Sequence, residues 1–114
     1  MNVLLVEDEP MISMLLCDMV ELAGHAVAGE AGSVDRALEM IEEFAPDAAI
    51  VDLRLHNRDS YPVMDRLRER GIPFAVASGF GSDIDRERAG EAVPIVSKPY
   101  SSGEVANVLS QLGG

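Results

Sequence analysis

Short apolar runs alternate along the chain with amphipathic stretches whose hydrophobic residues recur at helical spacing. This alternation constrains the fold more than any other feature. Continuous apolar runs of this length are typical of strands covered on both faces. A strand and a helix together take up about 20–25 residues, which is the spacing of repeated strand-helix units. The predicted strands are Val3–Val6, Ala26–Ala31, Ala48–Val51, Phe74–Ala77 and Val93–Val96.

The helical stretches between these runs carry recognisable start and stop residues. Gly24 ends the first, and Ser33 is the predicted N-cap of the second. Ser101-Ser102-Gly103-Glu104 fits a capping box for the last helix. The segment Ser82–Asp85 can cap a short helix with few apolar residues, which we expect to be the least stable element.

Five strand-helix units predict an α/β fold: a (βα)5 three-layer sandwich, with a parallel five-stranded sheet and helices on both faces. Pro94 cannot donate to a ladder, so the strand Val93–Val96 is expected at a sheet edge. The 114 residues are predicted to form one domain, residues 1–114, without an output domain.

Composition excludes several classes of function. The formal net charge of −11 repels nucleic acids and anionic membranes, so neither is an expected partner. No apolar stretch approaches the roughly 20 residues needed to span a bilayer. The chain has one cysteine, Cys17, and its N-terminus lacks the features of a signal peptide. We therefore expect a cytoplasmic protein.

Functional side chains follow the predicted strands. In open α/β sheets the site lies beyond the carboxyl ends of the strands, so these side chains should share one sheet edge. Carboxylates gathered there need a cation, and Mg²⁺ with oxygen ligands fits them. An aspartate beside such a metal can act as a nucleophile and form an aspartyl phosphate, with a lysine and a hydroxyl available to the phosphoryl oxygens. The residues are Glu7, Asp8, Asp52, Ser78 and Lys98.

Four short motifs carry a family resemblance that covers essentially the whole chain. The motifs are Val-Glu-Asp-Glu-Pro at 6–10, Ile-Val-Asp-Leu at 50–53, Ala-Ser-Gly at 77–79 and Ser-Lys-Pro-Tyr at 97–100. In this order on a (βα)5 pattern they resemble the response regulator receiver domain. The resemblance implies a flavodoxin-like fold with strand order 2-1-3-4-5.

The resemblance also implies individual roles. Asp52 would be the phosphoacceptor, and Lys98 would pair with the phosphate. Ser78 would be the switch hydroxyl. The Lys98–Pro99 peptide would be cis. The metal ligands would be Glu7, Asp8, Asp52 and the backbone carbonyl of Arg54.

One position departs from the family pattern. Receivers usually carry Tyr or Phe three residues before the lysine as a rotameric switch, and this chain has Ile95 there. The segment 73–81 instead resembles a subgroup named for a Phe-Ala-Thr-Gly-Tyr-like motif. In that subgroup an aromatic residue after the fourth strand is thought to replace the missing switch. Here that residue is Phe80.

The favoured function is that of a phosphoacceptor in a two-component phosphorelay. Its donor would be a sensor histidine kinase or a histidine phosphotransfer protein. Phosphorylation would switch the loop after the fourth strand and the face formed by helix 4, strand 5 and helix 5. The protein would then bind an unknown downstream protein or act as a phosphate sink. We expect a monomer or weak dimer that catalyses only its own phosphorylation and dephosphorylation, and is otherwise not an enzyme.

Two alternatives stay open. The first is a Mg²⁺-dependent phosphatase or phosphotransferase that uses Asp52 as its nucleophile. Such enzymes normally have a second Asp two residues after the nucleophile, and this chain has Arg54 there. The second is a receiver that acts purely as a phosphorylation-independent interaction module. Such a module would not need Asp8, Asp52 and Lys98, and the presence of all three argues against it.

Overall fold

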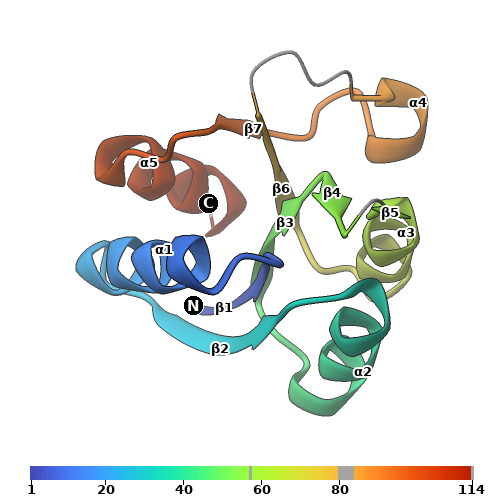
Figure 1. The fold of residues 1–114 in the computed structure, drawn as a ribbon, viewed down its shortest axis with the longest axis horizontal. Coiled ribbons are helices and arrows are strands. Elements are labelled where there is room, and N and C mark those ends of the chain that lie inside the picture. Colours follow the sequence, from blue (N-terminus) through green and yellow to red (C-terminus); the bar gives the residue numbers. More distant parts are fainter. Residues whose placement is uncertain (57, 80–83, 114) are drawn as a thin grey trace.

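The computed structural model describes residues 1–56, 58–79 and 84–113. Five parallel strands form the central sheet, and helices cover both of its faces (Figure 1). The elements, in chain order, are β1 (Asn2–Val6), α1 (Pro10–Leu22), β2 (Ala26–Ala31), α2 (Val34–Phe44), β3 (Ala48–Asp52), β4 (Arg54–Leu55), β5 (Arg58–Asp59), α3 (Tyr61–Glu69), β6 (Phe74–Ser78), α4 (Arg86–Ala89), β7 (Ile95–Ser97) and α5 (Ser102–Gly113).

The order of the main sheet is β2-β1-β3-β6-β7. This is the predicted order 2-1-3-4-5 when the strands of that sheet are counted along the chain, so the predicted fold class is confirmed. Side chains alternate across the sheet because successive residues of a strand point to opposite faces. Leu4 and Val51 belong to the core under α2 and α3, whereas Leu5 and Ile50 belong to the core under α1 and α5.

Helix ends follow the predicted capping pattern. The Ser33 side chain accepts a hydrogen bond from the backbone N–H of Arg36 at 3.1 Å. The Ser101 hydroxyl accepts one from the N–H of Glu104 at 3.2 Å. Gly24 follows the C-cap of α1 with φ of +91°, a conformation that glycine adopts without strain.

Two details differ from the predicted strands. Strands β4 and β5, which were not among the predicted strands, pair as a short antiparallel ribbon. The last strand begins at Ile95 rather than Val93, so Pro94 precedes the strand. The Pro94 carbonyl still accepts a hydrogen bond from the N–H of Val76, and β7 lies at the sheet edge as expected.

The short helix α4 spans only Arg86–Ala89. Of the predicted capping segment, Asp85 is the N-cap, and its side chain accepts from the N–H groups of Glu87 and Arg88. Ser82 and Asp83 lie outside the described residues. Within the described ranges, no helix combines the length and the hydropathy that crossing a bilayer requires.

Candidate functional site

The carboxyl ends of the central strands bring together an acidic cluster. Glu7 and Asp8 directly follow strand β1, and Asp52 is the last residue of β3. Strands β1 and β3 are adjacent and parallel, so their ends meet at one edge. Each of the three residues offers a carboxylate oxygen, and these oxygens lie within 4.8 Å of one another. The predicted acidic cluster therefore forms in the structure.

Lys98, which follows β7, reaches across this edge to the carboxylates. Its Nζ lies 2.6 Å from Oδ2 of Asp52 and 3.3 Å from Oε2 of Glu7. The backbone positions the side chain, because the N–H of Lys98 donates to the Ser78 carbonyl at 3.0 Å. The Lys98–Pro99 peptide is cis, as the resemblance implied.

Burial distinguishes the members of the cluster. Glu7 and Asp52 are only 4% and 7% exposed, whereas Asp8 is half-buried. Burial, reinforced by the neighbouring Asp52 carboxylate, raises the pKa of Glu7 to about 8. Burial alone would lower the pKa of Lys98, but the Asp52 and Glu7 carboxylates hold it above its usual value. Lys98 is therefore a fixed positive charge at neutral pH.

The donor set fits a hard divalent cation. Oε1 of Glu7 is buried, and no group in the described part of the chain forms a hydrogen bond with it. A buried carboxylate oxygen without a partner is costly, and a cation among the acidic residues would satisfy it. Even when Glu7 carries a proton, one ammonium group stands against the two carboxylates of Asp8 and Asp52, so the cluster retains an excess of negative charge.

Backbone groups around the cluster hold two of its members. The N–H of Arg54 donates to Oδ1 of Asp52 at 3.3 Å. The N–H of His56 donates to Oδ2 of Asp8 at 3.1 Å, and the His56 ring lies 3.6 Å from the same oxygen. Sequence reasoning gave His56 no place in the site. No sequence pattern indicated this contact, because it depends on the backbone conformation of His56, whose φ is +47°.

A hollow of about 370 Å³ opens above Asp52. Its lining residues are Asp8, Glu9, Asp52, Leu53, Arg54, His56, Gly79 and Lys98. Asp52 is thus reachable from solvent although most of its surface is covered. Glu7 and Asp8 also line a neighbouring hollow of about 430 Å³ whose other wall includes Met11 and Met14 of α1.

The other predicted site residues, among those that the structure describes, form no hydrogen bond with the acidic cluster. Ser78 ends β6 at the same sheet edge, but among the described residues no hydrogen bond joins its hydroxyl to Asp52 or Lys98. Ile95 begins β7 opposite Val76 and is half-buried. Phe80, the candidate replacement for the aromatic switch, lies outside the described residues.

Comparison with known proteins connects this geometry to a family. Residues 3–110 match the family model described as the response regulator receiver domain. The transcriptional regulatory protein PdtaR of Mycobacterium tuberculosis is 31% identical over 107 residues, which cover 91% of this chain and 52% of PdtaR. The chain therefore spans about half the length of this curated relative.

Solved structures give the same result. The solution structure of SdrG from Sphingomonas melonis Fr1 superimposes with a TM-score of 0.87 at 35% identity, covering 99% of this chain and 96% of SdrG. The solution structure of the BeF3-activated conformation of SdrG from Pseudomonas melonis Fr1 gives a TM-score of 0.81 at 36% identity, covering 97% of this chain and 94% of SdrG.

Proposed function

Because the chain belongs to the family of response regulator receiver domains, whose members accept a phosphoryl group in two-component signalling, we propose that Asp52 is its phosphoacceptor. One observation carries this proposal. Asp52 lies at the carboxyl end of the central strand β3, 2.6 Å from the Lys98 ammonium and within the acidic cluster.

The reaction follows from the groups around Asp52. A carboxylate oxygen of Asp52 attacks the phosphorus of the donor, and the bond from phosphorus to the donor nitrogen or oxygen breaks. The leaving group keeps the electron pair, and an acyl phosphate forms. Lys98 faces the negative charge of the phosphoryl oxygens, and such charge neutralisation, together with positioning of the reactants, catalyses a transfer of this kind. The same geometry supports hydrolysis of the acyl phosphate by water.

The residues that would hold Mg²⁺ are Glu7, Asp8, Asp52 and the carbonyl of Arg54. When bound, the ion would neutralise part of the charge of the transferred group. The support for this assignment is the unpartnered, buried Oε1 of Glu7 together with the three carboxylates. Ser78 is proposed as the hydroxyl that contacts the phosphoryl group after transfer.

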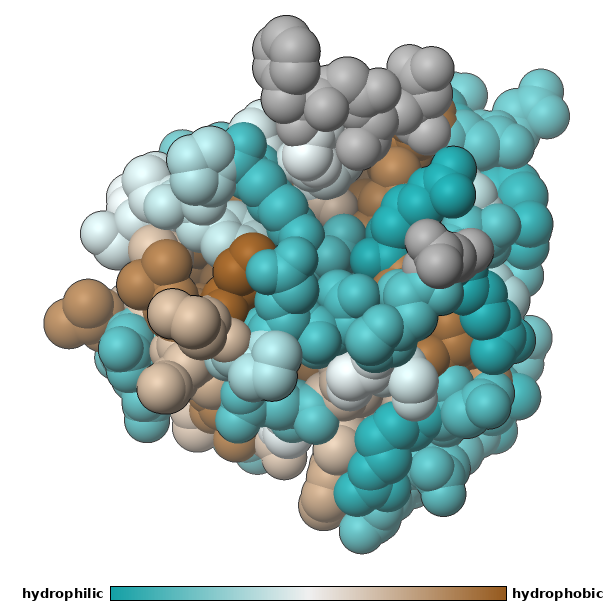
Figure 2. All heavy atoms as spheres, in the orientation of Figure 1, coloured by the Kyte–Doolittle hydropathy of each residue, from teal (hydrophilic) through white to brown (hydrophobic). Residues whose placement is uncertain are grey.

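The proposed phosphodonor is a histidine kinase or a histidine phosphotransfer protein, which would place the reaction in the cytoplasm. Its approach would be favoured over α1, where Met11 and Met14 are 83% and 61% exposed. Hydrophobic side chains gather over α1 on the left of the molecule, beside a hydrophilic centre (Figure 2). The output would be binding of a downstream protein to the face of α4, β7 and α5, or removal of phosphate from the relay.

The test is incubation with acetyl phosphate and Mg²⁺, followed by intact mass spectrometry. We expect one phosphoryl adduct in the wild type and none in Asp52→Asn. Asp59→Asn is the matched control, since Asp59 is an exposed carboxylate of the neighbouring ribbon. Sustained turnover of an unrelated phosphoester would instead favour the phosphatase reading, and the absence of an adduct with every donor would favour the interaction module.

A further inference from the structure

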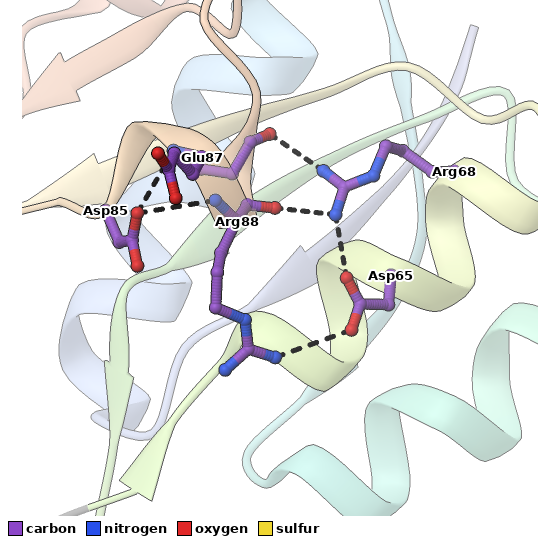
Figure 3. A network of polar contacts seen from close by, with 6 residues as sticks. Asp65, Arg68, Asp85, Glu87 and Arg88 are labelled. Atoms are coloured by element: carbon purple, nitrogen blue, oxygen red, sulfur yellow. Dashed lines mark hydrogen bonds and ion pairs between the residues drawn. The ribbon is translucent and has the colours of Figure 1, made fainter.

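Polar contacts hold helix α4 to helix α3. Among the residues of α4 only Ala89 is buried. The Arg68 guanidinium donates to the carbonyls of Ala89 at 2.8 Å and Arg88 at 2.6 Å. Asp65 bridges the two helices, with one oxygen 2.7 Å from Arg68 and the other 3.5 Å from Arg88 (Figure 3). These contacts anchor the C-terminal side of α4.

Tyr61 anchors the N-terminal side of the same helix. Its hydroxyl oxygen accepts a hydrogen bond from the backbone N–H of Asp85, the N-cap of α4, at 2.7 Å. The Arg88 guanidinium carbon lies 4.7 Å from the centre of the Tyr61 ring, which is cation–π distance. Tyr61 is only 8% exposed. One side chain of α3 thus holds both the cap of α4 and its third residue.

Tyr61 is also tied to the acceptor site. The preceding residue, Ser60, is fully buried and contacts the Leu53 carbonyl twice, through its N–H at 3.0 Å and its hydroxyl at 3.1 Å. Leu53 follows Asp52 directly, and its own N–H donates to Ala77 at 2.9 Å. A buried, hydrogen-bonded path therefore runs from Asp52 through Leu53 and Ser60 to Tyr61.

We propose that the Tyr61 hydroxyl is a clamp that opposes the switch, holding α4 in the arrangement of the unphosphorylated protein until Asp52 is modified. This inference rests on the proposed function of Asp52. It supplies a route from the site to α4 that does not need an aromatic residue at Ile95. Because Tyr61 holds the cap of α4, α4 leaves α3 only when the bond to Asp85 breaks.

If the Tyr61 hydroxyl is such a clamp, removing it should loosen α4 and raise the affinity of the site for a phosphoryl mimic. Tyr61→Phe keeps the ring and its contact with Arg88 but deletes the acceptor for the N–H of Asp85. Losing one net hydrogen bond shifts an equilibrium roughly three- to tenfold. We expect amide hydrogen exchange of residues 86–90 in the free protein to be faster by about that factor. Affinity for beryllofluoride with Mg²⁺, a mimic of the acyl phosphate, should rise by a similar factor.

The experiment is an NMR titration of the ¹⁵N-labelled chain with beryllofluoride at fixed Mg²⁺, combined with hydrogen exchange. Arg70→Gln is the matched control. Arg70 is the C-cap of α3 and pairs with Glu42 of α2, so this substitution removes an ion pair beside α3 that does not involve α4. Arg88→Met is a second test variant that removes the cation over the Tyr61 ring, and it should shift both measurements in the direction of Tyr61→Phe.

Unchanged or weaker beryllofluoride affinity in Tyr61→Phe, with wild-type exchange in α4, overturns the clamp while leaving the proposed function intact. A different result would refute the proposed function itself. If beryllofluoride changes no NMR chemical shift around Asp52 in the wild type, Asp52 is not the phosphoacceptor and the clamp that depends on it fails as well. Faster exchange in α4 together with tighter binding supports the clamp.

Discussion

The buried carboxyl of Glu7 makes the stability of the metal-free protein depend on pH. Its pKa is raised from 4.5 to about 8, first by burial and then by the adjacent Asp52 carboxylate, while Lys98 opposes the shift. Between these two values the folded protein holds a proton on Glu7 that the unfolded chain has released. The free energy of unfolding must therefore fall as pH rises from about 4.5 to about 8.

The size of this effect follows from the shift. One proton gives a slope of at most about 1.4 kcal/mol per pH unit, so the change between pH 5.5 and 7.5 is on the order of 2.5 kcal/mol. The measurement is urea unfolding followed by circular dichroism at both pH values in EDTA. Glu7→Gln is the reference protein, because its amide resembles the protonated carboxyl but does not titrate.

The informative quantity is the difference between the two proteins, since every other titrating group is present in both. The wild type should lose about 2.5 kcal/mol relative to Glu7→Gln across this range. Saturating Mg²⁺ at pH 7.5 should stabilise the wild type more than Glu7→Gln, because the ion binds the ionised carboxylate of the folded state. A difference that stays constant with pH would refute the assignment of a buried proton to Glu7.

Three further outcomes can be measured in the same unfolding assay. Lys98→Met should destabilise the metal-free protein by about 3 kcal/mol, because it leaves the buried Asp52 carboxylate without its cation. Ser60→Ala should cost about 1–3 kcal/mol, since the Leu53 carbonyl loses the buried hydroxyl donor; wild-type stability would contradict this. Gly71→Ala should cost about 1 kcal/mol from backbone strain alone, because φ is +69° and no atom beyond the neighbouring residues lies within 4 Å of the added methyl. A cost well above that would contradict strain as the sole cause.

The acceptor edge could be predicted from the sequence because hydrophobic pattern and topology determine it together. Each apolar run predicts a buried strand, and the strand order brings the ends of β1, β3 and β7 to one edge. Glu7, Asp8, Asp52 and Lys98 therefore meet although 91 residues separate the first from the last. The sheet fixes the position of side chains at the ends of its strands, so their proximity can be predicted without knowing individual contacts.

The anchoring of α4 could not be predicted in this way. The bond between Tyr61 and Asp85 joins a helix residue to the N-cap of another helix 24 residues away, and neither residue stands out in a hydrophobic pattern. The ribbon of β4 and β5 was missed for a related reason, because its four strand residues include three polar ones and carry no strand periodicity. Contacts of this kind depend on how two surfaces meet, which pattern alone does not specify.

These two parts of the molecule differ in what a phosphoryl group could change. The sheet edge rests on the ladders of β3 with β1 and β6, strands whose residues are almost all buried, so a local change of charge at Asp52 leaves it in place. Helix α4 buries only Ala89 and is otherwise held by contacts such as those with Tyr61, Asp65 and Arg68, each of about 1 kcal/mol or less. A modification that alters the site by a few kcal/mol is therefore sufficient to reposition α4 without disturbing the fold that holds the acceptor.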